Sequence, residues 1–278
     1  FEATWSPDED WFLDEHRTAR GEALLPGTGY IELAAGALVE LGEGQAFTLS
    51  DLFFFRPLWV ADGQSGEVRV VLEPGGAGYD LEVHSRVDLA DGRRGWQRHA
   101  QGSLSLKRLE PGPSLDLRAI QERSRRHLGP DPDGLRGGQE QHLRFGPRWR
   151  VLREVWHGEG ESLAQLELPA AYRGDLQQLG LHPALLDLAT GFAMELVPGY
   201  DPARGLWVPV RYEKIVVRDA LPARIFAYAT PSRRPASHGF FAFDLVLTDA
   251  EGHALVEVSG FTIRHLSEAL RLADQPPP

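Results

Sequence analysis

An internal repeat restricts the possible folds of this chain more than any other feature. A helix-like segment begins near Pro26 in the first half and near Pro183 in the second, an offset of 157 residues (183 − 26). Near the other end of the unit, Gly102 and Gly260 are offset by 158 residues (260 − 102). Two nearly equal offsets indicate that one structural unit occurs twice in the chain.

The sequence pattern of each copy predicts one long helix followed by antiparallel strands. Apolar spacing and first-turn prolines predict helices over 26–41 and 182–197. Alternating apolar and polar residues predict strands over 47–60, 66–73, 79–89 and 96–107, then 151–157 and 162–168, and finally 206–217, 222–230, 239–248 and 253–265. A single helix on one sheet leaves a face uncovered, so we expect the two copies to pack together as a pseudo-dimer within the chain.

The repeat also suggests the domain organisation. We predict an N-terminal unit over 1–110, a linker over 111–140 and a C-terminal unit over 141–278. The first residue is Phe1 rather than Met, and residues 273–278 read ADQPPP, which is the composition of a stiff linker. We therefore expect the chain to be a segment of a longer polypeptide.

Composition excludes several functions. The sequence has no cysteine, so disulfides and thiolate metal sites are impossible, and its histidines lack metal-ligand spacing. A net charge of −11 argues against nucleic acid as a partner. No apolar run is long enough to span a membrane. The arginines concentrated between Arg118 and Arg153 are either solvated surface or a patch for an acidic carrier protein or a phosphate-bearing arm.

The two copies differ at the positions that matter for chemistry. His16 in the first copy corresponds to Arg173 in the second, and Asp187 in the second corresponds to Tyr30 in the first. Each copy therefore contributes one distinctive ionisable group, and a single composite site between the copies would hold both. A histidine takes up a proton near neutral pH, and a buried aspartate can stay protonated and donate one.

The start of the first helix adds a third group. A backbone N–H at Gly27 would point outward with the positive end of the helix dipole, which suits a polarised carbonyl oxygen. A base, an acid and a carbonyl-binding amide together favour proton abstraction next to a carbonyl with loss of a hydroxyl. This reaction is the β-elimination of water.

These motifs resemble those of the dehydratase domains of modular type I polyketide synthases. His16, Gly21 and Pro26 resemble the family's His-x3-Gly-x4-Pro motif, Phe145-Gly146-Pro147 its Tyr-Gly-Pro motif, and HPALLD at 182–187 its aspartate motif. The segment 208–217 is similar to the family's strand after the second helix. The likeness covers essentially the whole chain and implies an α+β double hotdog fold, in which each curved antiparallel sheet wraps a central helix.

The resemblance also implies an activity. His16 would remove the C2 proton of a β-hydroxyacyl thioester and Asp187 would protonate the leaving C3 hydroxyl, which gives an α,β-unsaturated thioester. The implied substrate-binding residues are Pro26, Gly27, Phe145, Pro147, Leu186 and Gly191. The substrate would arrive on the phosphopantetheine arm of an acyl carrier protein, with no metal or bound cofactor. Neighbouring synthase domains, a homodimer and a cytoplasmic location are further expectations from the family.

Three positions depart from the family pattern. Four residues rather than three separate His16 from Gly21, with Arg20 at the usual glycine position, and this could shift the loop that carries the base. Phe145 replaces a tyrosine and loses its hydroxyl. Gly191 stands four residues after Asp187, where many members have Gln or His to orient the acid or the leaving group, so one hydrogen bond is missing.

Other functions stay open at this point. The altered 187–191 segment motivates a dehydratase that also moves the double bond to the β,γ position. A hotdog thioesterase and a non-catalytic carrier-binding module are two further interpretations. The sequence does not define the chain length, the branching or the stereochemistry of the substrate.

Overall fold

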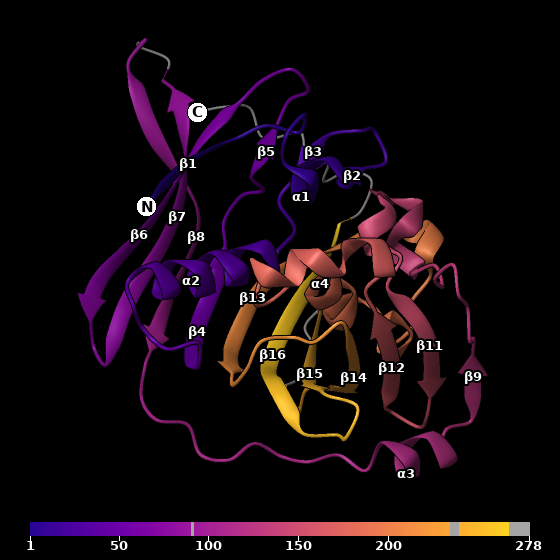
Figure 1. Ribbon diagram of the computed structural model, residues 1–278. Coiled ribbons are helices and arrows are strands. Elements are labelled where there is room, and N and C mark those ends of the chain that lie inside the picture. The colour runs from indigo at the N-terminus through magenta and orange to yellow at the C-terminus, as the bar shows by residue number, and fades with distance from the viewer. Residues whose placement is uncertain (90–91, 234–238, 267–278) are drawn as a thin grey trace.

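The computed structural model describes residues 1–89, 92–233 and 239–266 of the chain. Figure 1 shows one extended, curved sheet with two helices lying across one of its faces. The N-terminal half contains β1 (Glu2–Trp5), α1 (Trp11–Asp14), β2 (His16–Thr18), β3 (Ala23–Leu24), α2 (Gly29–Glu40), β4 (Phe47–Phe54), β5 (Trp59–Val60), β6 (Gly66–Gly75), β7 (Gly78–Asp88) and β8 (Arg94–Ser105). The expected linker ending 273–278 lies outside the described residues.

The rest of the chain supplies the second set of elements. They are α3 (Leu117–Glu122), β9 (Arg126–Leu128), η1 (Gly138–Gln141), β10 (Leu143–Phe145), η2 (Pro147–Trp149), β11 (Leu152–His157), β12 (Ser162–Glu167), η3 (Ala170–Gln177), α4 (Pro183–Gly191), η4 (Met194–Leu196), η5 (Pro202–Arg204), β13 (Leu206–Val217), β14 (Arg224–Pro231), β15 (Phe240–Thr248) and β16 (Ala254–Leu266). The predicted linker 111–140 thus contains α3 and β9, and β9 pairs with β11 at the edge of the sheet.

The two repeat units share one sheet. The strand order is β1-β6-β7-β8-β4-β13-β16-β15-β14-β12-β11-β9, and the units meet where β4 pairs antiparallel with β13. In this pair Phe53 lies opposite Arg211, its repeat equivalent at an offset of 158 residues (211 − 53). The local twofold axis of the repeat therefore crosses the sheet at the β4–β13 junction.

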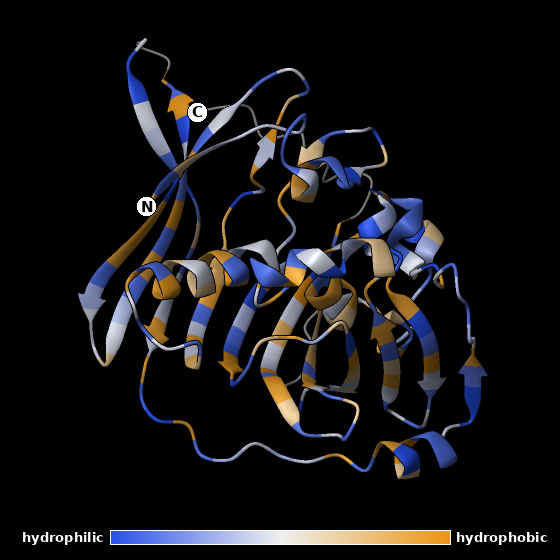
Figure 2. Cartoon of the chain, viewed as in Figure 1, coloured by the Kyte–Doolittle hydropathy of each residue, from blue (hydrophilic) through white to orange (hydrophobic). Residues whose placement is uncertain are grey.

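The core lies between the sheet and the two long helices. Figure 2 shows apolar residues alternating with polar ones along the long strands, as expected when one face of a sheet is buried. In β4 the buried positions are Phe47, Leu49 and Leu52, and α2 and α4 cover them with side chains such as Ile31 and Leu185. The predicted pseudo-dimer is confirmed, and so are the predicted strands apart from 47–60.

Three predicted element boundaries were wrong. The first helix begins at Gly29 rather than Pro26, because residues 26–28 form a turn in which the Gly29 N–H donates to the Pro26 carbonyl at 2.9 Å. The second helix ends at Gly191, and a separate 3₁₀ turn follows over Met194–Leu196. The predicted strand 47–60 is divided, because Pro57 lacks a backbone donor and the chain leaves the large sheet after Phe54.

A second, small sheet carries the histidine. Its order is β10-β2-β3-β5, and β2 lies between β10 of the second unit and β3 of the first. Phe145 pairs directly with His16 in this sheet. The small sheet therefore joins the Phe-Gly-Pro segment to the strand that holds the proposed base.

Candidate active site

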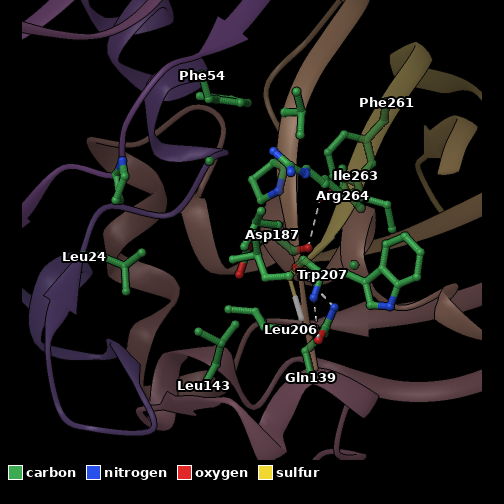
Figure 3. Close-up of a pocket in the computed structure, with 18 of the residues that line it drawn as sticks. Leu24, Phe54, Gln139, Leu143, Asp187, Leu206, Trp207, Phe261, Ile263 and Arg264 are labelled. Atoms are coloured by element: carbon green, nitrogen blue, oxygen red, sulfur yellow. Dashed lines mark hydrogen bonds between the residues drawn. The ribbon is translucent and has the colours of Figure 1, made fainter. Parts of the chain in front are cut away.

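A cavity of about 570 Å³ lies between the two units. Its walls come from both halves of the chain, and Figure 3 shows Asp187 between Leu24 and Leu143 on one side and Phe261, Ile263 and Trp207 on the other. The lining is predominantly apolar, and its volume is within the range of about 300–1,000 Å³ that small-molecule sites occupy. His16, Gly27, Tyr30, Asp187 and Gly191 all face this cavity.

His16 is held in one orientation at the cavity wall. Its side chain is 6% exposed, and its Nδ1 lies 2.9 Å from the backbone oxygen of Leu24. A carbonyl oxygen only accepts, so Nδ1 carries a proton and donates it to Leu24. In the neutral ring the proton-free nitrogen is then Nε2, the atom that faces Asp187 and can act as a base.

Asp187 lies in the second turn of α4 and faces His16. Its Oδ2 accepts a hydrogen bond of 2.9 Å from the indole N–H of Trp149 and lies 3.9 Å from His16 Nε2. Burial raises the pKa of this carboxyl, while His16 and the Trp149 N–H act in the opposite direction. Burial thus favours the protonated form of this carboxyl more than water would.

The two groups are close without a direct hydrogen bond. A separation of 3.9 Å exceeds ordinary hydrogen-bond distances, and both side chains reach the same cavity. A substrate carbon chain lying against them can therefore offer a proton to one and a hydroxyl to the other.

The equivalent positions in the opposite copies carry no acid–base pair. Tyr30 corresponds to Asp187, and it is buried and lines the same cavity. Arg173 corresponds to His16 and lies on η3, where it forms an ion pair of 2.5 Å with Glu167. The pseudo-symmetric fold therefore holds this acid and base together at one composite site.

Gly27 lies where α2 approaches the second unit. A side-chain Cβ at this position would come within 2.9 Å of Cγ of Pro209 in β13. Among the described residues, no acceptor is paired with the Gly27 N–H. Gly27 lines the cavity two residues before α2 begins, so its unpaired N–H is available to a ligand oxygen there.

The remaining predicted substrate-binding residues differ in their placement. Phe145 lines the cavity, with its ring 5.6 Å from the His16 ring. Leu186 is completely buried in the core, and among the described residues that line the cavity Pro26, Pro147 and Leu186 are absent. At Gly191 an added Cβ would meet no atom within 4 Å, so this position leaves open space next to the acid.

The extra residue between His16 and Gly21 is accommodated in a turn. Arg20 is exposed at the tip of the β2–β3 hairpin, and Gly21 adopts a φ of +96°, which favours glycine. The hairpin closes through a 2.9 Å hydrogen bond from the Thr18 N–H to the Glu22 oxygen. The insertion therefore does not move the base away from Asp187.

Sequence reasoning missed a charged cluster next to the site. Arg148 donates to Glu15 Oε1 at 2.5 Å and to Asp175 Oδ2 at 2.7 Å, and its guanidinium lies over the ring of Trp11. His182 is fully buried 3.5 Å from the same Asp175 oxygen, and burial lowers its pKa. This Arg148 cluster connects the residue before His16 with the start of α4.

Sequence reasoning also missed Trp149, Gln139, Trp207 and Arg264. Trp149 bonds the acid, and the other three line the cavity. The contact between Trp149 and Asp187 spans 38 positions, so the only local signal for Trp149 was its place two residues after Pro147.

Most arginines of the proposed basic patch pair with acids; Arg123 with Glu161 and Arg150 with Glu140 are examples. The patch is thus largely neutralised.

Within the described part of the chain, no group of three or more His, Asp or Glu side chains is arranged to hold a metal ion. Across the same residues, no helix has the length and apolar character needed to cross a membrane.

Comparisons with known proteins agree with this geometry. Residues 1–86 match the family described as polyketide synthase dehydratase domain, and residues 113–273 match the family described as polyketide synthase dehydratase N-terminal domain. Polyketide synthase PksM of Bacillus subtilis is 24% identical over 92% of the chain and 6% of its own length. Polyketide synthase GfsE of Streptomyces halstedii is 32% identical over 68% of the chain and 5% of its own length.

Solved structures give the same fold. The dehydratase domain from the CurF module of the curacin polyketide synthase superposes with a TM-score of 0.82 at 23% identity, covering 96% of this chain and 93% of that one. A CurJ dehydratase described as an inactive mutant, with a histidine replaced by phenylalanine, has a TM-score of 0.83 at 24% identity and covers 97% and 92%. A CurK dehydratase described as an inactive mutant, with an aspartate replaced by asparagine, has a TM-score of 0.79 at 21% identity and covers 96% and 92%.

The fold and the site define a double hotdog protein with a histidine and a carboxyl at the junction of its two units. The chain belongs to the dehydratase domain family of polyketide synthases, which are hydro-lyases. The predictions of fold, family and reaction class are thereby confirmed. The chain spans about 6% of the length of a relative such as PksM.

Proposed function

We propose that this domain removes water from a β-hydroxyacyl thioester carried on the phosphopantetheine arm of an acyl carrier protein. The observation that carries the proposal is the pairing of His16 Nε2 with Asp187 Oδ2 at 3.9 Å inside an apolar cavity. One group comes from each repeat unit. The two ends of an elimination therefore meet two different groups, a base and an acid.

The reaction follows from the protonation states of these groups. His16 Nε2 takes the C2 proton, and the electrons of the C2–H bond form the C2–C3 double bond. The C3–O bond breaks as Asp187 gives its proton to the leaving hydroxyl, which departs as water. His16 ends protonated and Asp187 ends ionised, and proton transfer between these neighbours restores the pair.

In this proposal the backbone N–H of Gly27 binds the thioester carbonyl oxygen of the substrate. Charge develops on the thioester oxygen as the C2 proton leaves, and a backbone N–H at a helix N-terminus stabilises such charge. Phe145, which contacts the His16 ring, and Gly191 lie along the remaining substrate path. Pro26, Pro147 and Leu186 would support this path from behind the cavity wall.

The partners follow from the family. We infer that the domain works within a cytoplasmic synthase beside its carrier protein and neighbouring domains, and as a homodimer. The resemblance implies no metal and no bound cofactor. Two curacin dehydratases described as inactive mutants carry a histidine or an aspartate substitution, and the same two residue types support the roles of His16 and Asp187.

Mass spectrometry of short β-hydroxyacyl thioesters tests the proposal. We expect the wild type to release a product lighter by one water. His16→Ala and Asp187→Asn should each lose about 10²–10⁴-fold in turnover, the usual contribution of a general acid or base. Unchanged turnover in either variant would remove that residue from the mechanism, and an inert wild type would favour a carrier-binding module.

The same assay separates the remaining alternatives. A free acid as product would identify a thioesterase. Gly191 leaves open space beside the acid, which could allow the double bond to move. In D2O, a β,γ-alkene with deuterium at C2 would identify the isomerase, and a conjugated product without further deuterium uptake would exclude it.

A further inference from the structure

We propose that Trp149 is the positioning residue for the acid of this site. Its indole N–H holds Oδ2 of Asp187 and leaves Oδ1 to carry the proton to the leaving hydroxyl. This inference rests on the proposed dehydration and adds a residue that the motifs do not identify. It begins from the 2.9 Å hydrogen bond between Trp149 Nε1 and Asp187 Oδ2.

The indole has little freedom to move. Trp149 is 2% exposed, and its ring packs edge-on against Trp11 at 5.9 Å and parallel to Phe145 at 6.1 Å. It also lies 5.7 Å from the His16 ring. A donor fixed by packing on several sides can set the direction of the carboxyl it binds.

The backbone of Trp149 is anchored to the residue before the base. The Gly146 N–H donates to the Glu15 backbone oxygen at 2.8 Å, and the Arg148 N–H donates to Glu15 Oε2 at 2.7 Å. The Trp149 N–H closes the η2 turn on Gly146 at 3.1 Å. One short turn therefore fixes the acid relative to the base, although the two lie on different units.

The chemistry of indole determines which oxygen can donate. An indole N–H donates and never accepts, so Oδ2 must act as an acceptor while the bond exists. The carbonyl oxygen of a neutral carboxyl accepts better than its hydroxyl oxygen, so the bond to Oδ2 favours the proton on Oδ1. As this proton moves to the leaving hydroxyl, negative charge grows on the carboxyl and the Trp149 bond strengthens, so it favours the transition state over the bound substrate.

No other side chain replaces this donor from α4. Gly191 lies one helical turn after Asp187, on the same face, and has no side chain. Because an added Cβ there would meet nothing within 4 Å, a longer polar side chain can be introduced. A polar side chain at position 191 can therefore be used to replace the hydrogen bond that is lost when Trp149 is substituted.

The test compares Trp149→Phe with the double variant that combines Trp149→Phe and Gly191→Gln. Phenylalanine keeps an aromatic ring and removes the N–H. We expect kcat to fall about 10- to 100-fold in the single variant, with KM changed less than about threefold, as for a lost bond to a developing charge. The amide introduced by Gly191→Gln should restore about tenfold or more of that loss, since it can donate to Asp187.

The pH profile gives a second readout. The Trp149 N–H lowers the pKa of Asp187, so its removal should move the alkaline limb of kcat to higher pH. Trp11→Phe is the matched control, because it removes an indole N–H from the same aromatic cluster without touching Asp187. Urea unfolding of each variant verifies that it is folded.

Three outcomes would overturn the proposal. They are an unchanged kcat in Trp149→Phe, an equal loss in Trp11→Phe, and a loss with neither rescue by Gly191→Gln nor movement of the alkaline limb. Failure of the proposed dehydration is distinguishable, because the wild type itself would then release no water or would release a free acid.

Discussion

Single atoms decide how closely the two units can meet at the active site. At Gly27 the missing side chain allows α2 to approach Pro209 of β13, where a Cβ would be only 2.9 Å from the ring. A proline ring in a strand has no flexible end that could move aside. Glycine at position 27 is therefore required for this close contact, which lies at the wall of the cavity.

We predict that Gly27→Ala lowers kcat/KM at least tenfold and the free energy of unfolding by about 1–3 kcal/mol, because overpacking pushes α2 away from β13. Activity assays and urea unfolding measure the two effects. Gly36→Ala is the control, since it lies in the exposed middle of α2, the helix that follows Gly27, and its Cβ meets no atom within 4 Å. It should stabilise the protein by about 0.5–1 kcal/mol. Similar results for both alanines would contradict the role of the close approach.

At the scale of elements, the Arg148 cluster holds η2, the end of α1 and η3 together, and His182 connects it to the start of α4. The Arg148 side chain is 18% exposed and bridges Glu15 and Asp175, whose side chains are 9% and 22% exposed. A guanidinium suits this bridge because its donors point in several fixed directions. Breaking such a pair leaves partly buried carboxylates without their counter-charge.

We therefore expect Arg148→Met to lower the free energy of unfolding by about 3 kcal/mol in urea titrations, because two acids lose one shared partner. Arg118→Met is the matched control. Its pair with Glu122 is largely exposed, with side-chain exposures of 87% and 64%, and it should cost less than about 0.5 kcal/mol. Equal destabilisation by both substitutions would show that the Arg148 cluster contributes no more than a surface ion pair.

The elements also show how far sequence reasoning extends. Alternation predicted nearly every long strand, because each has one buried face, and the repeat predicted the double hotdog fold. The ends of helices were harder to predict than strands, since α4 ends at Gly191 although the apolar pattern continues to residue 197. The pairing of His16 with Asp187 was inferable from the unequal copies. Trp149 was not, because a 3₁₀ turn has no periodicity that points to a partner 38 residues away.

At the scale of the whole molecule, the two units are joined by a titratable contact outside the active site. Glu32 lies on α2 of the first unit, and its Oε2 accepts from the Leu181 N–H of the second unit at 2.6 Å. Burial raises the pKa of Glu32 to about 7, although the Leu181 and Gly180 amides lower it. The contact precedes α4, the helix that carries Asp187, so its charge state affects how the units are held together.

The sign of the pH dependence follows from this raised pKa. Glu32 releases its proton near pH 4.5 in the unfolded chain and near pH 7 in the folded one, so the folded state is favoured most below about pH 4.5. Its contribution to the free energy of unfolding declines as the pH rises to about 7, by at most about 3 kcal/mol. Glutamine at this position keeps an oxygen that accepts from Leu181 but cannot ionise.

We predict that Glu32→Gln gains stability relative to the wild type as the pH increases from about 4.5 to about 7. Urea unfolding at several pH values measures the difference between the two proteins, in which the contributions of all other groups cancel. The difference should then stay constant above about pH 7.5, where Glu32 is ionised in both states. Parallel curves for Glu32→Gln would show that this carboxyl titrates alike in the folded and unfolded chain, and that the contact between the units does not depend on its charge.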